Sequence, residues 1–241
     1  MTTTEINENC KGILINGVPV AVYGGNSDKA FLFVHGQGGN KGEAARLYSI
    51  AGSLGYDVVA LDLPGHGIRT DVENFVPWKV LPEIKAVFDQ TKARYRSLSV
   101  RAISIGAYFS LLALKGEKID KCLLSSPLLD MRAMIEGMMA AANVSERRLR
   151  EEKEIVTDGG AVLSERYYEF AKENIPVALC KDTHILYAEG DTLIPRKTVE
   201  DFAEKNDCRL TVIQGGEHWL HLPHDIERME EWERAAITEK L

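Results

Sequence analysis

The sequence predicts an α/β protein in which a mostly parallel, twisted sheet carries helices on both faces. Short apolar runs of strand length alternate with longer segments whose apolar residues recur at helical spacing, the pattern of β-α-β units. Side chains with acid, base or nucleophile chemistry follow several of these strands, and open α/β sheets place functional sites at such strand ends. The chain of 241 residues has the size of one such domain with a sizeable core.

Composition and charge narrow the class of partner. Hydrophobic residues make up 45% of the chain and charged residues 27%, the proportions of an ordinary soluble globular protein. The formal net charge of −7 disfavours nucleic acid and anionic membranes as partners, because both would repel the protein. We therefore expect a small-molecule partner.

The cysteines and the start of the chain indicate a cytoplasmic protein. Cys10, Cys122, Cys180 and Cys208 are widely scattered, which favours isolated thiols in a reducing compartment over a disulfide framework or a zinc site. Residues 1–8 contain neither a basic nor an apolar targeting segment. The chain also lacks an uninterrupted run of about 18 apolar residues that could span a membrane.

The first elements form the expected edge of the sheet. Residues 12–23 contain two β-like runs separated by Asn16-Gly17, a strong signal for an antiparallel hairpin. A fully apolar strand follows at 29–34, then a helix over 43–54. The strand at 56–61 ends in a sharp loop at 62–67.

The middle of the chain continues the alternation. Helical spacing extends over 77–95, where Pro82 either kinks the helix or marks its first turn. A buried strand from 97 turns abruptly into a buried helix after Ser104, and Gly116 is a plausible stop for that helix. Residues 121–127 form a further buried strand.

Residues 131–178 break the rhythm, so we expect a helical cap inserted between two parts of a core domain, 1–130 and 179–241. The insertion contains two candidate helices, one rich in methionine and one over 166–172, which are separated by the charged run 146–154 and by Asp158-Gly159-Gly160. Packing against the core explains the methionines most simply. Alternatively, they supply an adaptable apolar wall for acyl or alkyl groups.

Regular alternation resumes after the insertion. We expect a strand that starts at 183 and leads into Asp191, a helix over 196–205, and a strand at 209–213 that leads into His218. A final helix over 224–238 directs four residues towards the sheet: Ile226, Met229, Trp232 and Ala236.

Ser104 stands at the apex of the strand-to-helix turn and is the candidate nucleophile. Such a turn strains the backbone and pushes the hydroxyl out of the sheet, so the residues two positions away on either side must be small. Ala102 and Gly106 meet this requirement. The pattern A-x-S-x-G replaces the first glycine of G-x-S-x-G by the next smallest side chain.

Asp191 and His218 complete a candidate triad with Ser104. A hydroxyl needs a base to take its proton, and an imidazole needs a carboxylate to fix its tautomer and stabilise its cation. The order Ser, Asp, His is the one expected for this type of turn. Asp130 is a rival acid. His221 and His224 are rival bases, but only His218 lies directly off a strand end.

Five motifs in this order resemble those of the α/β-hydrolase family, and the match covers nearly the whole chain. They are HGQGG at 35–39, DLPGHG at 62–67, AISIG at 102–106, GDTLIP at 190–195 and GGEHW at 215–219. The resemblance implies an oxyanion hole made by the backbone N–H groups of Ile105 and Gln37. It also implies acyl transfer to water through an acyl-enzyme on Ser104.

The resulting hypothesis is a serine hydrolase that cleaves carboxylic esters of small to medium acyl groups. A peptidase or thioesterase would use the same residues, because selectivity resides in the cap and loops. A non-catalytic binding module is the third alternative. We expect neither a dinucleotide nor a metal as cofactor, since no G-x-G-x-x-G motif follows a strand and the histidines and carboxylates fall on different elements. His35 and His66 are interpreted as loop-packing residues and His184 as structural.

Overall fold

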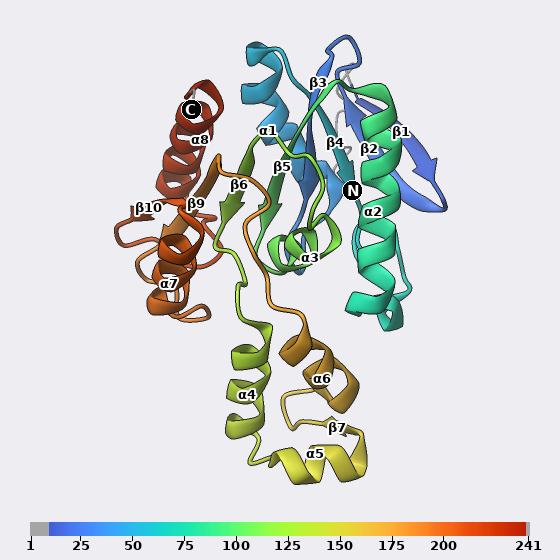
Figure 1. The fold of residues 1–241 in the computed structure, drawn as a ribbon, viewed down its shortest axis with the longest axis vertical. Coiled ribbons are helices and arrows are strands. Elements are labelled where there is room, and N and C mark those ends of the chain that lie inside the picture. The colour runs from blue at the N-terminus through green and yellow to red at the C-terminus, as the bar shows by residue number, and fades with distance from the viewer. Residues whose placement is uncertain (1–9, 240–241) are drawn as a thin grey trace.

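The computed structural model describes residues 10–239 and contains an eight-stranded sheet (Figure 1). From the β4 strand to the far edge all neighbours are parallel, whereas β1 and β2 form an antiparallel hairpin that pairs with β4. This confirms the predicted fold class. The strands lie in the order β1 (Cys10–Ile15), β2 (Val18–Tyr23), β4 (Asp57–Leu61), β3 (Lys29–Val34), β5 (Ser97–Ile103), β6 (Cys122–Ser125), β9 (Thr183–Ala188) and β10 (Arg209–Ile213).

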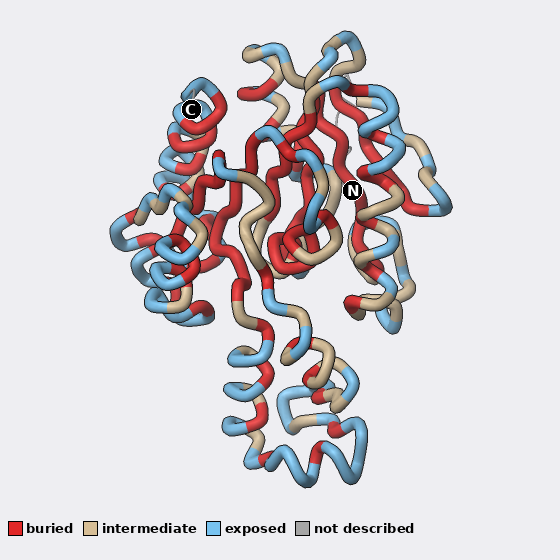
Figure 2. Tube along the Cα trace, in the orientation of Figure 1, coloured by how far each residue is buried: buried red, intermediate tan, exposed pale blue. Residues whose placement is uncertain are grey.

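Helices cover both faces of this sheet, so its central strands are buried (Figure 2). On one face lie α1 (Ala44–Ala51) and α8 (Pro223–Thr238), and on the other α2 (Pro77–Arg94), α3 (Ile105–Ala113) and α7 (Arg196–Asn206). Single 3-10 turns at Lys41–Glu43, Gly52–Leu54 and Val72–Asn74 lie in the connections. Alternate residues of a strand point to opposite faces, so Phe31 packs with α1 while Leu32 packs with α2.

Local sequence explains the hairpin and the start of α2. Asn16 and Gly17 both have positive φ, 50° and 84°, as a two-residue type I′ turn requires. Pro77 occupies the first turn of α2 and Pro82 lies inside the helix. The first-turn alternative for Pro82 was therefore wrong, because Pro77 already fills the position where a missing N–H costs nothing.

The final helix faces the sheet with a mixture of apolar and charged residues. Met229, Trp232 and Ala236 are buried against the sheet as predicted. Ile226 is only half-buried, so its predicted inward position was wrong. The buried positions on this helix also include Asp225 and Glu233.

Residues 131–173 form a separate small lobe that extends beyond the carboxyl end of β6 (Figure 1). It contains α4 (Met131–Ala141), α5 (Glu146–Glu152), α6 (Glu165–Glu173) and an antiparallel hairpin of β7 (Glu154–Val156) and β8 (Val162–Ser164). The ring of Trp78, at the start of α2, contacts those of Tyr167 and Phe170 on α6. This contact ties the lobe to the core.

The charged run in the lobe is a helix rather than a separator, so the expectation of two helices was wrong. Ser145 caps α5 by accepting the N–H of Arg148, and Arg148 pairs with Glu152 one turn later at 2.7 Å. Capping and i,i+4 ion pairs stabilise a helix without any apolar periodicity. Leu149 is the one buried residue of α5 and anchors it.

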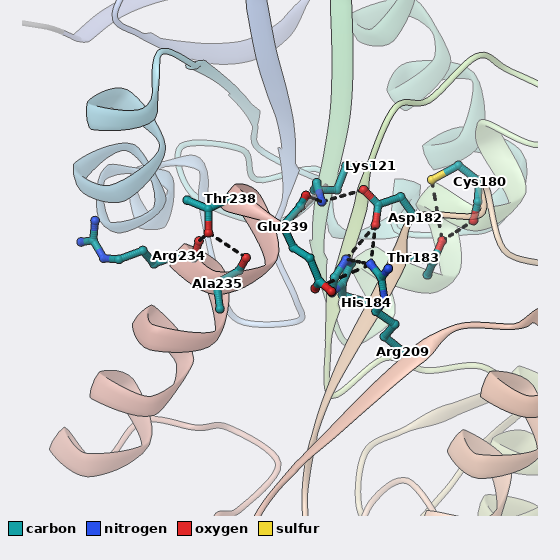
Figure 3. Close-up of polar contacts among 10 residues, drawn as sticks. All are labelled: Lys121, Cys180, Asp182, Thr183, His184, Arg209, Arg234, Ala235, Thr238 and Glu239. Atoms are coloured by element: carbon teal, nitrogen blue, oxygen red, sulfur yellow. Dashed lines mark hydrogen bonds and ion pairs between the residues drawn. The ribbon is translucent and has the colours of Figure 1, made fainter. Parts of the chain in front are cut away.

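A network of charged groups joins the end of α8 to the amino ends of β9 and β10 (Figure 3). Asp182 lies 2.6 Å from Lys121 and 2.8 Å from Nε2 of His184, and it also pairs with Arg209. Lys121 donates to the carbonyl of Glu239, just after α8. Burial alone would raise the pKa of Asp182, but hydrogen bonds from Lys121 and His184 outweigh it and lower that pKa. His184 therefore lies in a network at the amino end of the sheet.

A second buried ion pair joins α8 to the central strand. Arg101 on β5 donates Nε–H to Glu233 at 2.7 Å, and their side chains are 1% and 4% exposed. Its Nη1 also donates to the carbonyl of Ala102 and to the Ser125 hydroxyl. The Arg101 guanidinium thus links α8 to two adjacent strands.

Removal of Glu233 would leave a buried guanidinium without its carboxylate. We expect Glu233→Ala to lower the free energy of unfolding by about 3–5 kcal/mol, the usual cost of breaking a buried pair from one side. Urea denaturation measures this change. Glu231→Ala, at an exposed position of the same helix, is the control; equal midpoints for the two variants would contradict the prediction.

Candidate active site

Ser104 joins β5 to α3 in a strained backbone conformation. Its φ is 49° and its ψ −120°, a region that costs a non-glycine residue of order 1–3 kcal/mol. Backbone hydrogen bonds hold it there: its N–H donates to Ser125, and its carbonyl accepts from Ala107, Tyr108 and Leu128. The turn expected from the sequence is present and places the hydroxyl at the carboxyl edge of the sheet.

Glycines allow this turn to sit directly against the end of β3. A Cβ on Gly106 would lie 2.2 Å from the carbonyl oxygen of His35, and a Cβ on Gly36 would lie 3.3 Å from the Cβ of Ser104. The small residue at 106 is therefore required by a backbone contact. Ala102, the departure from the glycine pattern, is fully buried in the core, and its methyl group is accommodated.

The structure brings the three residues of the predicted triad together. His218 follows β10 and places Nε2 2.9 Å from Oγ of Ser104. Its Nδ1 lies 2.6 Å from Oδ2 of Asp191, which follows β9. An ionised carboxylate can only accept, so Nδ1 carries the proton and Nε2 is free to accept the serine proton.

Loop contacts fix the acid and the imidazole relative to each other. The second oxygen of Asp191, Oδ1, accepts the N–H groups of Leu193 and Ile194 at 2.8 and 2.9 Å. Gly190 donates to the carbonyl of Gly216, and a Cβ on Gly190 would lie 2.7 Å from that oxygen. The two loops therefore touch through their backbones, which only glycine permits at residue 190.

The rival residues lie in other environments. The Asp130 carboxylate accepts the N–H of Ala133 and caps α4. The exposed side chain of His224 lies 3.1 Å from the carboxylate of Asp225, and His221 is exposed. The carboxylate that pairs with His218 is that of Asp191.

The two predicted oxyanion donors belong to residues next to the turn at Ser104 or next to Gly36, which packs on that turn. Ile105 begins α3, so its N–H has no acceptor within the helix, and Gln37 follows the glycine that packs on Ser104. Neither N–H has a hydrogen-bond acceptor within residues 10–239. Both groups are thus available to a ligand.

His35 orients the peptide that carries one of these donors, a role that the sequence did not reveal. Its Nδ1–H donates to the carbonyl of Gly36 at 2.7 Å, and its Nε2 accepts the N–H of Leu63 at 3.1 Å. In a trans peptide the C=O and the following N–H point in opposite directions. The bond to the carbonyl of Gly36 therefore fixes the direction of the N–H of Gln37. The residue type, a histidine directly after a strand, was the only signal in the sequence.

Asp62 and His66 also support the loop that follows β3 and contains Gln37. The carboxylate of Asp62 accepts both the backbone N–H and the ammonium of Lys41, at 2.8 and 2.5 Å, and also the N–H of Ile68. The ring of His66 packs against that of His35, with centroids 5.1 Å apart and the ring planes tilted by 48°. The packing interpretation of His66 thus agrees with the structure.

An apolar pocket of about 350 Å³ lies between α4 and the loop that follows Asp191. Its walls include Met134 and Met138 from α4 and Leu193 to Pro195 from the loop. Within residues 10–239, no group of three or more His, Cys, Asp or Glu side chains is arranged to hold a metal ion. In the same range, no helix is long and apolar enough to cross a membrane.

Solved structures with the same architecture identify the fold. No protein-family model and no curated protein matches the sequence. A protein from Agrobacterium vitis classed as a hydrolase has a TM-score of 0.76 at 21% identity, over 95% of this chain and 98% of its own. Est1E from Butyrivibrio proteoclasticus, with ferulic acid bound, has a TM-score of 0.69 at 20% identity, over 93% and 96%. Mouse alpha/beta hydrolase domain-containing protein 10 has a TM-score of 0.69 at 15% identity, over 92% and 96%. These similarities confirm the predicted α/β-hydrolase fold.

The contact between Gly106 and the end of β3 predicts that substitution of Gly106 destabilises the protein more than substitution of Ala102, on the other side of Ser104. We expect Gly106→Ala to lower the free energy of unfolding by about 3 kcal/mol, because the added methyl group overlaps a backbone carbonyl. Ala102→Gly only removes a methyl group from a strand and costs about 1 kcal/mol or less. Chemical denaturation of both variants checks this order, and the reverse order would contradict it.

The environment of His35 predicts a loss of stability in mild acid. Burial lowers its pKa from 6.5 to about 4, so between these values the unfolded chain binds a proton that the folded protein does not. The stabilisation is therefore complete above pH 6.5 and falls by about 3 kcal/mol as the pH drops to 4.

His35→Asn retains a donor for Gly36 and removes this titration. We expect its free energy of unfolding, measured by urea denaturation from pH 4 to 7, to fall less with acid than that of the wild type. The difference between the two curves isolates His35 from other groups, including His184. Parallel curves would refute the assignment.

Proposed function

We propose that this protein, which has the α/β-hydrolase fold, is a serine hydrolase that cleaves carboxylic esters of small to medium acyl groups. The observation that carries the proposal is the chain of hydrogen bonds from Ser104 through His218 to Asp191, set on a strained turn with two free N–H donors beside it. Nucleophile, base, orienting acid and oxyanion donors are the parts that acyl transfer requires.

In the proposed mechanism, His218 takes the proton of Ser104 as Oγ attacks the ester carbonyl carbon. The N–H groups of Ile105 and Gln37 stabilise the negative charge that develops on the carbonyl oxygen, and Asp191 stabilises the imidazolium. The tetrahedral intermediate expels the alcohol, which takes the proton from Nε2. A water molecule then gives its proton to His218 and attacks the acyl-enzyme, releasing the carboxylic acid and restoring Ser104.

The lobe of residues 131–173 supports an ester substrate of limited size in this proposal. We assign it the role of a cap, since α4 forms one wall of an apolar pocket whose other wall is the loop after Asp191. That pocket suits the hydrocarbon part of an ester better than a charged peptide, because a buried charge needs a partner. Est1E, a solved structure of this fold, has the carboxylic acid ferulic acid bound, which supports an ester of a carboxylic acid as the substrate class.

Turnover of a short-chain p-nitrophenyl ester tests the proposal. We expect Ser104→Ala and His218→Ala each to lower kcat by about 10⁴-fold or more, and Asp191→Asn by about 10⁴-fold, since each removes one member of a unit that acts together. His221→Ala, an exposed histidine on the same loop, is the control and retains activity.

A fluorophosphonate probe separates the alternatives. The proposal expects labelling of the wild type and none of Ser104→Ala. Labelling without turnover of any ester would instead favour a thioesterase or peptidase, and a folded protein without labelling would favour a binding module.

A further inference from the structure

We infer that the pocket between α4 and the loop after β9 binds a hydrocarbon chain of the ester and so selects substrates by chain length. The inference rests on the proposed function, because it assigns the pocket to the substrate of the same triad. It adds a substrate class, esters whose acid or alcohol part contains about eight to twelve carbons. It also assigns to Gly137 the limit on the length of that chain.

The helix α4 has two apolar faces, and only one is covered. Met131, Ile135 and Met139 are buried against the rest of the lobe. Met134, Gly137, Met138 and Ala141 lie three or four residues apart, hence on one face, and they line the pocket. The side chain of Leu193 opposite is 45% exposed. An apolar face that meets an apolar loop across a cavity is suited to an apolar ligand.

Two residues of the pocket wall are hydrogen-bonded to catalytic residues. Leu128, which lines it, donates its N–H to the carbonyl of Ser104 at 3.1 Å. Ile194, on the opposite wall, donates its N–H to the carboxylate of Asp191 at 2.9 Å. A chain attached to a carbonyl at Ser104 therefore has this pocket as its neighbour on the β6 side.

The polarity and volume of the pocket define the ligand. Its polar side chains are Asp130, whose carboxylate already accepts the N–H of Ala133, and Thr198. An apolar cavity of about 150 Å³ holds a benzene ring. The volume of about 350 Å³ is more than twice as large and accommodates about eight to twelve carbon atoms. Flexible methionine side chains can follow chains of different shape.

Gly137 allows the pocket to be filled without disturbing the protein. A Cβ at this position would meet no atom within 4 Å, and leucine is a better helix former than glycine. Gly137→Leu is therefore expected to fold and to occupy ligand space. Ala140→Leu adds a large side chain at an exposed position of the same helix outside the pocket and is the matched control.

The test measures kcat/KM for p-nitrophenyl esters from acetate to dodecanoate, and for butyrate esters of alcohols from methanol to decanol. We expect Gly137→Leu to lose about 10-fold or more on the long members of one series, a loss typical of a few displaced methylenes. Ala140→Leu, outside the pocket, should stay within about 2-fold of the wild type on every ester of both series. A loss in the acyl series assigns the pocket to the acid half, and a loss in the other series assigns it to the alcohol half.

Unchanged chain-length profiles in Gly137→Leu, with Ser104-dependent turnover intact, would overturn the inference and leave the proposed function standing. If no ester is turned over, the proposed function fails, and binding still tests the pocket. We expect p-nitrophenyl octanoate to bind the Ser104→Ala protein about 10-fold more weakly when Gly137→Leu is added, measured by tryptophan fluorescence. Equal binding would overturn the inference.

Discussion

The contact between the turn at Ser104 and the end of β3 is the constraint on which the site depends. Gly106 lies so close to the carbonyl of His35 that a single methyl group would not fit. This closeness places the strained serine beside Gly36, the residue before Gln37. The strain at Ser104 persists because hydrogen bonds from neighbouring strands and loops over-determine the conformation.

Close contact between backbone segments also fixes the loops that carry Asp191 and His218. Gly190 and Gly216 join the loops of the acid and the imidazole, and two N–H groups hold the free oxygen of Asp191. Behind these loops, charged networks join α8 to β5 and to the amino ends of β9 and β10. The imidazole of His218 thus approaches Ser104 from loops that are anchored at both ends of their strands.

The sequence predicted those parts whose physics is local or periodic. Apolar runs and Asn16-Gly17 predicted the sheet and its hairpin, and the rule that parallel strands end at one edge predicted that Ser104, Asp191 and His218 would meet. Apolar periodicity did not predict the helix α5, because its stability comes from a cap and ion pairs around a single buried residue, Leu149. The sequence also did not predict the buried carboxylates of α8, because the partner of Glu233 lies 132 residues away on β5.

Two glycines differ in whether the surrounding structure leaves room for a side chain. At Gly106 an added Cβ would meet backbone at 2.2 Å, whereas at Gly137 it would meet nothing within 4 Å. The first position belongs to the core sheet, where any change moves the serine and the oxyanion donors together. The second belongs to the lobe after β6, whose helix α4 forms one wall of the pocket. Side chains on α4 can therefore vary the ligand that fits while the geometry around Ser104 stays unchanged.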